Sequence, residues 1–339
     1  MTRKLASIRK ISNLLQIEGA DNIELAIVDG WKVVVAKNVG HKVGDLVVYC
    51  EVDSFLPIKP EYEFLRKSSF KKMGNQEGFR LKTIKLRGQV SQGLILPLRE
   101  VSIPNKYFLF EGMDITKELD IVKYEPPIPA ELAGKIKGLF PSFIPKTDEE
   151  RIQNLSKEFD QWKSSKDKEF YVTEKLDGSS ATFYIKDGVF GVCSRNLELL
   201  ETDSNTFWKY AREVDLEGKM SKLGRNISLQ GELIGEGIQG NPYNIKGHSV
   251  RFFNGFDIDK YEYLELSSLR YITDLFGVEM VPVLNTDFDL PESIDDLITF
   301  ADGKSKLNPS FDREGVVIRS KDKSVSFKVI SNKFLLNEK

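Results

Sequence analysis

The chain has 339 residues, with 49 basic and 51 acidic side chains and a formal net charge of −2. This balance excludes a protein coated in positive charge, although local basic stripes can still bind nucleic acid. The hydrophobic fraction of 40% is typical of a globular protein, and no apolar run is long enough to cross a membrane. Two separated cysteines and two histidines give no disulfide framework and few ligands for a histidine-based metal site. Because the basic N-terminus lacks the apolar run of a secretion signal, we expect an intracellular protein, cytoplasmic or nuclear, with no membrane partner.

The first part of the chain, residues 1–120, predicts a small closed β-barrel. Strands rich in Val, Ile and aromatic residues are expected at residues 23–28, 31–36, 45–49 and 80–86, with turns between them. Several short strands at this spacing suggest such a barrel. Four basic side chains accompany the last strand, namely Arg80, Lys82, Lys85 and Arg87. They either form a solvated strand face or line a groove that follows a phosphate backbone.

A connector and a helix are expected next. Residues 121–146 contain Pro126, Pro127 and Pro129, which favour an extended segment between two domains. A helix is predicted to begin at Thr147, because Thr147 and Glu150 form a capping box. Apolar residues then recur on one face of this helix and predict core packing: Ile152, Leu155, Phe159 and Trp162.

The remaining residues, 147–339, predict antiparallel sheets flanked by helices. Strands are expected at residues 170–174, 181–185, 189–194, 227–234, 250–258, 315–320 and 325–330. Helices are expected at residues 205–222, 267–276 and 293–301. Since strands and helices do not alternate regularly, the predicted fold class is α+β and not a doubly wound sheet.

Lys175 lies where a predicted strand enters a turn, in the run EKLDGSS. A lysine can act as a nucleophile when its amine loses a proton, which burial or a neighbouring cation favours. Asp177, two residues later, could orient a ribose, a metal-bound water or the lysine itself. A charged strand end before an Asp-Gly turn is common, so this motif alone is weak.

Four further charges lie at or inside apolar strands or next to a hairpin: Arg195, Glu232, Glu314 and Lys328. Each one alone could be an edge-strand charge that faces water, but a buried charge is costly unless it is paired or coordinated. Together they favour a functional site that binds a metal ion and a triphosphate. Carboxylates can hold Mg²⁺, and the basic residues can offset the charge of a triphosphate while Lys175 attacks its α-phosphorus.

Three phenylalanines, Phe252, Phe253 and Phe256, offer a candidate aromatic face for stacking a purine. Alternate residues of a strand face opposite sides of a sheet, so at least one of the three is expected in the core.

The order of these motifs resembles the covalent nucleotidyltransferases, which comprise RNA ligases, DNA ligases and capping enzymes. The motifs are E-K-L-D-G, S-R-N, G-E-L, F-F-N-G-F-D-I, E-G-V-V-I and S-F-K-V-I. The N-terminal runs GWKVVVAK, KVGD, EVDSFLP and LRGQVSQGL resemble the OB module of the fifth family of ATP-dependent RNA ligases. The resemblance covers nearly the whole chain. It implies an N-terminal OB-type barrel at 1–120, a connector at 121–146 and a nucleotidyltransferase (adenylation) domain at 147–339.

The resemblance also implies a three-step ligation that uses ATP with Mg²⁺ or Mn²⁺. ATP adenylates Lys175, the AMP passes to a 5′-phosphate, and a 3′-hydroxyl attacks the activated end. The implied partner is a nicked duplex with RNA on the 3′-hydroxyl side, and no protein partner is required. The basic residues of the first domain would contact this duplex.

Roles for the other residues follow from the same resemblance. Asp177, Glu232 and Glu314 would act with the metal, directly or through water. Lys328 would contact the α-phosphate, and Phe256 would stack on adenine. Arg195 would bind the ribose or the incoming nucleotide, Glu232 the ribose or a metal-bound water, Glu174 would help to fix the nucleotide, and Arg151 would reach the phosphates.

The chain departs from the family pattern at Ile330, where many related RNA ligases have a second lysine in the last motif. Lys323 or Lys333 could supply the missing charge, or Lys328 could suffice. The short segment after this motif leaves no room for the OB domain that DNA ligases and capping enzymes commonly carry there. Two alternatives stay open: a GTP-dependent capping-type nucleotidyltransferase and a catalytically idle nucleic-acid-binding protein.

Overall fold

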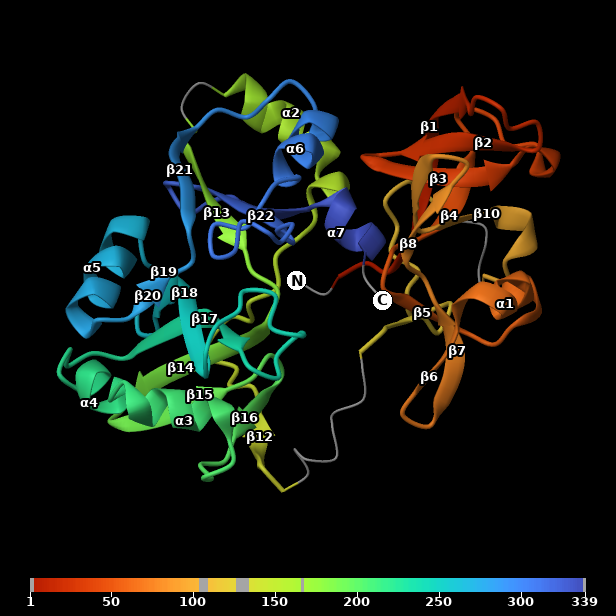
Figure 1. Ribbon diagram of the computed structural model, residues 1–339. Coiled ribbons are helices and arrows are strands. Elements are labelled where there is room, and N and C mark those ends of the chain that lie inside the picture. The colour runs from red at the N-terminus through yellow and green to blue at the C-terminus, as the bar shows by residue number, and fades with distance from the viewer. Residues whose placement is uncertain (1–2, 104–108, 126–133, 166–167, 338–339) are drawn as a thin grey trace. The chain divides into compact units, whose positions relative to one another are not determined.

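The computed structural model describes residues 3–103, 109–125, 134–165 and 168–337 (Figure 1). The chain divides into two compact units. Among the described residues, the N-terminal unit comprises residues 3–125 and Ile152–Glu158, and the C-terminal unit comprises residues 134–151 and Phe159–Asn337. The three connector prolines, Pro126, Pro127 and Pro129, lie outside the described residues. No helix in the described part of the chain is long and apolar enough to span a bilayer.

The described part of the N-terminal unit contains two sheets and a separate ribbon. The five-stranded sheet has the order β10-β4-β1-β2-β3, with β1 Ala6–Gln16, β2 Ile23–Val28, β3 Trp31–Ala36, β4 Leu46–Cys50 and β10 Leu94–Pro97. The second sheet has the order β11-β5-β7-β6, with β5 Ser54–Pro57, β6 Phe70–Met73, β7 Gln76–Arg80 and β11 Val122–Lys123. The ribbon pairs β8 Thr83–Leu86 with β9 Gln89–Gln92. Short helices lie at η1 Lys37–Val39, η2 Pro60–Leu65, α1 Arg66–Ser69 and η3 Leu98–Glu100.

The strand predictions for this unit are largely confirmed, with one error. The strands at residues 23–28 and 31–36 are confirmed, and the next one is shifted by one residue. The single strand expected at 80–86 is wrong, because the chain leaves β7 at Arg80 and begins β8 at Thr83. Leu81 lies between them, buried in the core, with its N–H bonded to the Ser54 carbonyl. Tertiary packing of Leu81 therefore breaks the alternating pattern.

The described part of the C-terminal unit contains an eight-stranded sheet and a four-stranded sheet, both antiparallel except for one parallel pair, β18 with β20. The eight-stranded sheet has the order β12-β16-β15-β14-β17-β18-β19, with β20 also paired to β18. Its strands are β12 Ile136–Leu139, β14 Ser179–Lys186, β15 Val189–Cys193, β16 Leu197–Leu199, β17 Ile227–Gly235, β18 His248–Asp257, β19 Glu262–Tyr263 and β20 Glu279–Met280. The four-stranded sheet has the order β21-β13-β22-β23, with β13 Phe170–Lys175, β21 Val283–Phe288, β22 Gly315–Ser320 and β23 Ser326–Ile330. Only three residues separate β13 from β14, so the Leu176–Gly178 turn joins the two sheets.

Helices complete this α+β fold. The short helix η6 Ile152–Asn154 belongs to the N-terminal unit, and α2 Ser156–Ser164 begins there and ends in the C-terminal unit. The C-terminal unit also contains α3 Thr206–Glu213, α4 Leu216–Ser221, α5 Leu266–Phe276, α6 Ile294–Ala301 and α7 Asn332–Asn337. Figure 1 shows α3, α4 and α5 on one side of the large sheet, and their buried residues share a core with it, including Trp208, Met220, Leu269 and Phe252. The helix expected at 205–222 is broken between α3 and α4, where Asp215 takes a positive φ of 49°.

The helix predicted to begin at Thr147 is wrong, because residues 145–151 run as an extended strap and α2 begins only at Ser156. Thr147 Oγ1 lies 2.7 Å from Ser180 Oγ, so this hydroxyl does not cap a helix. The strap pairs with β23 instead: the Lys328 N–H donates to the Glu150 carbonyl (2.8 Å), and Arg151 forms a parallel bridge with Lys328. These tertiary hydrogen bonds override the local capping signal.

Candidate active site

Lys175 is the last residue of β13, and its side chain meets Glu314. Lys175 Nζ donates to Glu314 Oε2 at 2.7 Å, with 26% and 14% of the two side chains exposed. The register of β13 and β22 explains this contact, since Lys175 is paired with Gly315, the residue after Glu314. A Cβ at position 315 would clash with the Val329 backbone, so glycine lets β22 and β23 approach here.

Glu232 lies close to the same lysine from the other sheet. It is paired with Ser180 across β14 and β17. A Cβ at Gly178 would lie 2.9 Å from Glu232 Cγ and would clash with the Leu233 carbonyl. The glycine of the turn therefore allows the backbone after Lys175 to lie against β17, next to Glu232.

The charged groups of this cluster shift one another's pKa values. Burial alone would lower the pKa of the Lys175 amine, but Glu314, Glu232 and Asp177 outweigh burial, and the pKa is raised. Burial, together with Glu314 and Asp177, raises the pKa of Glu232 to about 8, although Lys175 opposes the shift. One ammonium thus faces three acidic side chains, of which Glu232 resists ionisation. This excess of negative charge suits an additional cation.

Glu232→Gln is expected to stabilise the free protein at neutral pH. The ordinary pKa of Glu232 is 4.5, and in the folded protein it is raised to about 8. At a pH between these two values the carboxyl group ionises in the unfolded chain but stays protonated in the folded one. The free energy of unfolding therefore falls as the pH rises through this window. Glutamine removes this cost, and we expect a gain of about 1–3 kcal/mol and a melting temperature higher by ~2–6 °C. Thermal denaturation at neutral pH and below pH ~4 measures it, because the gain should vanish in acid. Equal melting temperatures at neutral pH would contradict the assignment.

Lys328 shares a sheet face with Lys175. Across the four-stranded sheet, Thr173 is paired with Val317, and Val317 with Lys328. Paired residues share a face, and so do residues two apart in one strand, which puts Lys328, Ile330 and Lys175 on the same side. The structure therefore places Lys328 on the same sheet face as the nucleophile, two residues along β23 from Ile330, which is in register with Lys175. Ile330, at the position of the missing second lysine, is only 4% exposed.

Glu174 is not brought to this face, because its side chain points to the opposite side of β13. It is 1% exposed, and one carboxylate oxygen accepts the Lys306 N–H at 2.8 Å. Burial raises its pKa, while Ser305 and Lys306 oppose the shift. In the structure this carboxylate holds the loop at Ser305–Lys306, and it does not approach Lys175.

The strap of residues 145–151 connects several predicted residues within the C-terminal unit. Asp148 forms an ion pair with Arg195, and Glu149 accepts from Arg319 Nη2 at 2.8 Å. Arg151 is 6% exposed, and its backbone pairs with that of Lys328 in a parallel β-bridge. The strap therefore ties Arg195, on the loop between β15 and β16, and Lys328, on β23, to one short segment.

Phe256 lies deep in the core, with 2% of its surface exposed. It makes edge-on contacts with Tyr261 and Tyr263, at ring-centroid distances of 5.1 and 5.2 Å. Phe252 lies in the core beneath the helices, and Phe253 is partly buried beside Leu176. The expectation that at least one of the three phenylalanines belongs to the core is confirmed.

Sequence reasoning missed Tyr243, which lies in the loop between β17 and β18. Its hydroxyl accepts the Asp177 backbone N–H at 2.7 Å, and its ring packs with Leu176 and Ile234. It also missed Gln230, whose amide donates to the Pro145 carbonyl at 2.8 Å and positions the strap. The run GEGIQGNPYNIKG signals only a loop and gives no indication of which strand end the tyrosine contacts.

The four basic residues predicted to contact nucleic acid lie in different surroundings within the N-terminal unit. Arg80 is bonded to Asp53 at 3.3 Å, and its guanidinium carbon lies 4.5 Å from the centre of the Tyr124 ring. Lys82 is half-buried, whereas Lys85 and Arg87 are exposed on the β8–β9 ribbon. The structure brings only the last two together at a projecting position.

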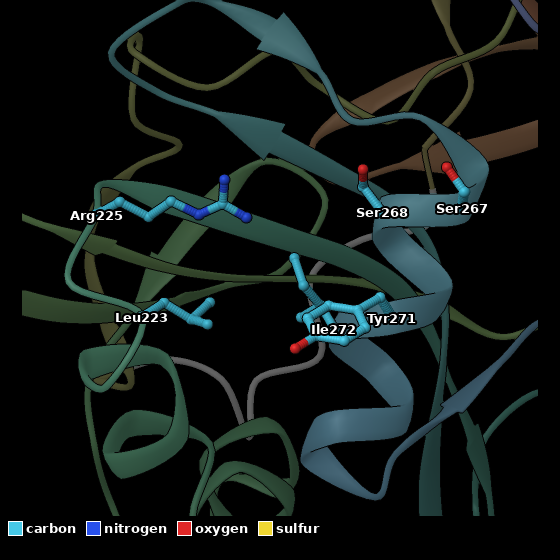
Figure 2. Close-up of a pocket in the computed structure, with 6 residues that line it drawn as sticks. All are labelled: Leu223, Arg225, Ser267, Ser268, Tyr271 and Ile272. Atoms are coloured by element: carbon cyan, nitrogen blue, oxygen red, sulfur yellow. The ribbon is translucent and has the colours of Figure 1, made fainter.

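A surface depression of about 560 Å³ in the C-terminal unit contains none of the predicted site residues. It is lined by Leu223, Arg225, Ser267, Ser268, Tyr271 and Ile272. Figure 2 shows Arg225 across the depression from the start of α5. The candidate active site is therefore defined by Lys175 and its neighbours, not by this depression.

Comparisons with known proteins identify the family of each part of the chain. Residues 5–98 match an OB-fold domain model, and residues 168–330 match the RNA ligase family model. No curated protein sequence gives a significant match. The chain is 42% identical to a Naegleria gruberi RNA ligase solved as a glutamate-to-alanine mutant with ATP and Mn, with 99% of each chain covered and a TM-score of 0.91.

Two further structures of the Naegleria gruberi enzyme are similar. The RNA ligase with pyrophosphate is 43% identical over 98% of each chain, with a TM-score of 0.90. Another glutamate-to-alanine mutant, with AMP and Mn, is 42% identical over 99% of each chain, with a TM-score of 0.92. Identity at this level over the full length of both chains establishes the family. The chain belongs to the ATP-dependent RNA ligases with an N-terminal OB-fold domain.

Proposed function

We propose that this ligase seals nicks between a 3′-hydroxyl and a 5′-phosphate in duplexes, with RNA preferred on the 3′-hydroxyl side, through AMP bound covalently to Lys175. The observation that carries the proposal is the contact of Lys175 Nζ with Glu314 Oε2 at 2.7 Å, in a cluster that also includes Glu232 and Asp177. A lysine amine surrounded by hard carboxylates, with a second lysine on the same sheet face, suits nucleotidyl transfer from ATP.

In the first step, the Lys175 amine gives up a proton and attacks the α-phosphorus of ATP. A P–N bond forms and the bond to pyrophosphate breaks. Lys328 and Arg151, whose backbones pair at the edge of the four-stranded sheet, would offset the charge on the phosphates. Arg195 binds the ribose or the incoming nucleotide.

In the second step, an oxygen of the 5′-phosphate attacks the AMP phosphorus and Lys175 leaves, so that AMP is joined to the nucleic acid through a pyrophosphate link. In the third step, the 3′-hydroxyl attacks the 5′-phosphorus and AMP leaves. Glu232, Glu314 and Asp177 lie beside the nucleophile through all three steps. They are suited to taking up protons and holding cations.

A divalent cation fits this donor set, because carboxylates are the ligands that Mg²⁺ and Mn²⁺ prefer. Asp177, Glu232 and Glu314 would hold it, directly or through water. In the described part of the chain, no three His, Cys, Asp or Glu side chains converge as a ready-made metal site. This agrees with the habit of Mg²⁺, which takes one or two carboxylates together with substrate phosphates. When bound, the cation would neutralise charge on the transferring phosphoryl group.

The similar Naegleria gruberi structures support ATP as the nucleotide and a divalent metal as the cofactor. Lysine-to-alanine and arginine-to-alanine mutants of that enzyme were solved with ATP and Mn, and a lysine-to-methionine mutant with AMP and Mn. We extend this chemistry to Lys175 and to the basic residues that lie on its sheet face.

Tyr243→Phe is expected to slow the first step. The tyrosine hydroxyl accepts the Asp177 N–H at 2.7 Å in a buried position, so phenylalanine leaves that donor without this acceptor. A lost acceptor costs about 1–3 kcal/mol, and we expect Lys175-AMP formation to slow about tenfold or more. Single-turnover labelling with radioactive ATP measures this rate.

The matched control is Tyr62→Phe. The Tyr62 hydroxyl is also buried but has no hydrogen-bond partner among the described residues. Its removal should leave the rate of adenylation unchanged. If Tyr243→Phe were adenylated as fast as the wild-type enzyme, the tyrosine would not position the nucleophile turn.

The proposed substrate is tested with nicked duplexes that differ only in the sugar at the 3′-hydroxyl end. We expect efficient sealing when the last residues on this side are ribonucleotides, and much weaker sealing when they are deoxyribonucleotides, because the 2′-hydroxyl distinguishes them. Equal sealing of both ends would contradict RNA preference. Covalent label from GTP but not from ATP would favour the capping-type alternative, and no label from either would favour an idle binding protein.

A further inference from the structure

The β8–β9 ribbon projects from the N-terminal unit on a fixed base. At the base, Ser91 Oγ accepts the Val34 N–H at 3.0 Å, and the Tyr49 hydroxyl donates to the Gln92 carbonyl at 3.2 Å. Ser91 and Gln92 are 4% and 3% exposed. The ribbon is therefore attached to the five-stranded sheet through β9, while β8 and the turn are directed outward.

The tip of the ribbon combines exposed aliphatic and basic side chains. All residues from Ile84 to Gly88 are exposed, with Ile84 at 47% and Leu86 at 38%. Ile84 and Leu86 are two apart in one strand, so they share a face. Arg87 and Gly88 have φ values of 46° and 83°, as in the tight two-residue turns of hairpins. This places Arg87 at the outermost position.

The ribbon lies in a stretch without acidic side chains. Between Glu77 and Glu100 the chain has no Asp or Glu, whereas five basic residues occur there: Arg80, Lys82, Lys85, Arg87 and Arg99. With 51 acidic residues in 339, about three would be expected in a stretch of this length. Single exposed aliphatic residues are ordinary, but two on one face of a ribbon whose charged side chains, Lys85 and Arg87, are both basic indicate a polyanionic partner that also offers apolar surface.

We propose that the β8–β9 ribbon lies in the shallow minor groove of an A-form duplex, with Ile84 and Leu86 against the riboses and Lys85 and Arg87 on the flanking phosphates. A nucleic-acid duplex offers both kinds of surface. Two paired strands are broader than the minor groove of undistorted B-form DNA, about 6 Å wide, so DNA would have to be deformed to admit them, whereas the minor groove of A-form RNA is already wide and shallow. The proposal rests on the proposed function and adds a source of RNA preference that is independent of the 3′-hydroxyl.

The test measures binding of the full-length protein, without ATP, to RNA and DNA duplexes of one sequence at several salt concentrations. We expect Ile84→Ser with Leu86→Ser to weaken RNA binding about tenfold with no change in its salt dependence. Lys85→Gln with Arg87→Gln should weaken it by a similar factor and reduce the slope of log affinity against log salt by roughly two. Both double variants should reduce the preference for RNA over DNA.

Two controls isolate the ribbon. Leu15→Ser with Val43→Ser removes two exposed aliphatic side chains elsewhere in the same unit, 43% and 60% exposed, and should bind as the wild type does. Formation of Lys175-AMP should be equal in all variants. If the wild type sealed RNA-ended nicks but Ile84→Ser with Leu86→Ser bound RNA normally, the ribbon proposal would be overturned and the proposed function kept. Equal losses on RNA and DNA would overturn the minor-groove assignment.

Discussion

Lys175→Ala is expected to abolish the covalent AMP adduct, with a loss of more than about a thousandfold in the yield of labelled enzyme, because the amine that forms the P–N bond is removed. Sealing of ends with a plain 5′-phosphate should be lost to the same extent. Sealing of ends that already carry AMP should persist, since the third step does not use the lysine as a nucleophile. Labelling with ATP and gel analysis of both substrates measure these three results.

Lys186→Ala is the matched control for this experiment. Lys186 is also a strand-end lysine paired with a carboxylate, Asp187, but it lies at the far end of β14 from the nucleophile turn. Its removal should leave adenylation unchanged. If Lys175→Ala formed the adduct at the wild-type yield, Lys175 would not be the nucleophile and the mechanism would be wrong.

Glu314→Gln is expected to change both the rate of adenylation and its pH dependence. Glu314 is the strongest of the groups that raise the pKa of Lys175 against the effect of burial. A lysine with a raised pKa holds its proton to higher pH, so the nucleophilic amine becomes available only as pH rises. Glutamine removes this anion, and the pH profile should therefore shift towards lower pH.

The maximal rate of the same variant should fall about a hundredfold, because a carboxylate that would act with the metal is lost. Single-turnover adenylation across the neutral and alkaline range measures both effects. A lower rate with an unshifted profile would mean that Glu314 acts on the metal or the phosphates without holding the Lys175 proton.

Much of the site could be predicted because its charges interrupt apolar strands in a fixed order. Lys175, Glu232, Glu314 and Lys328 stand out in the sequence for this reason. Glu314 and Glu232 lie close to Lys175, and the strand pairings place Lys328 on the same sheet face. The position of Glu174 was also open to prediction, since adjacent strand residues point to opposite faces. Family resemblance assigned it to the nucleotide, whereas its side chain holds the loop at Ser305–Lys306.

Other features depend on contacts between distant residues, which local patterns do not encode. Thr147 and Glu150 have the spacing of a capping box, yet the strap that contains them pairs with β23. Leu81 interrupts an alternating strand because the core of the N-terminal unit takes up its side chain. Tyr243 acts on the Asp177 N–H from a loop more than sixty residues away in the sequence. Such partners are set by tertiary packing.

The central claim is tested most directly by a chase of the isolated Lys175-AMP enzyme. The enzyme is labelled with ATP, freed from nucleotide and mixed with nicked duplexes that end in ribose or deoxyribose at the 3′-hydroxyl. Mass spectrometry should locate the label on Lys175, and the label should transfer to the 5′-phosphate and leave as AMP with sealing of the ribose-ended nick. A label on another residue, or an adduct that no nicked duplex discharges, would contradict the account.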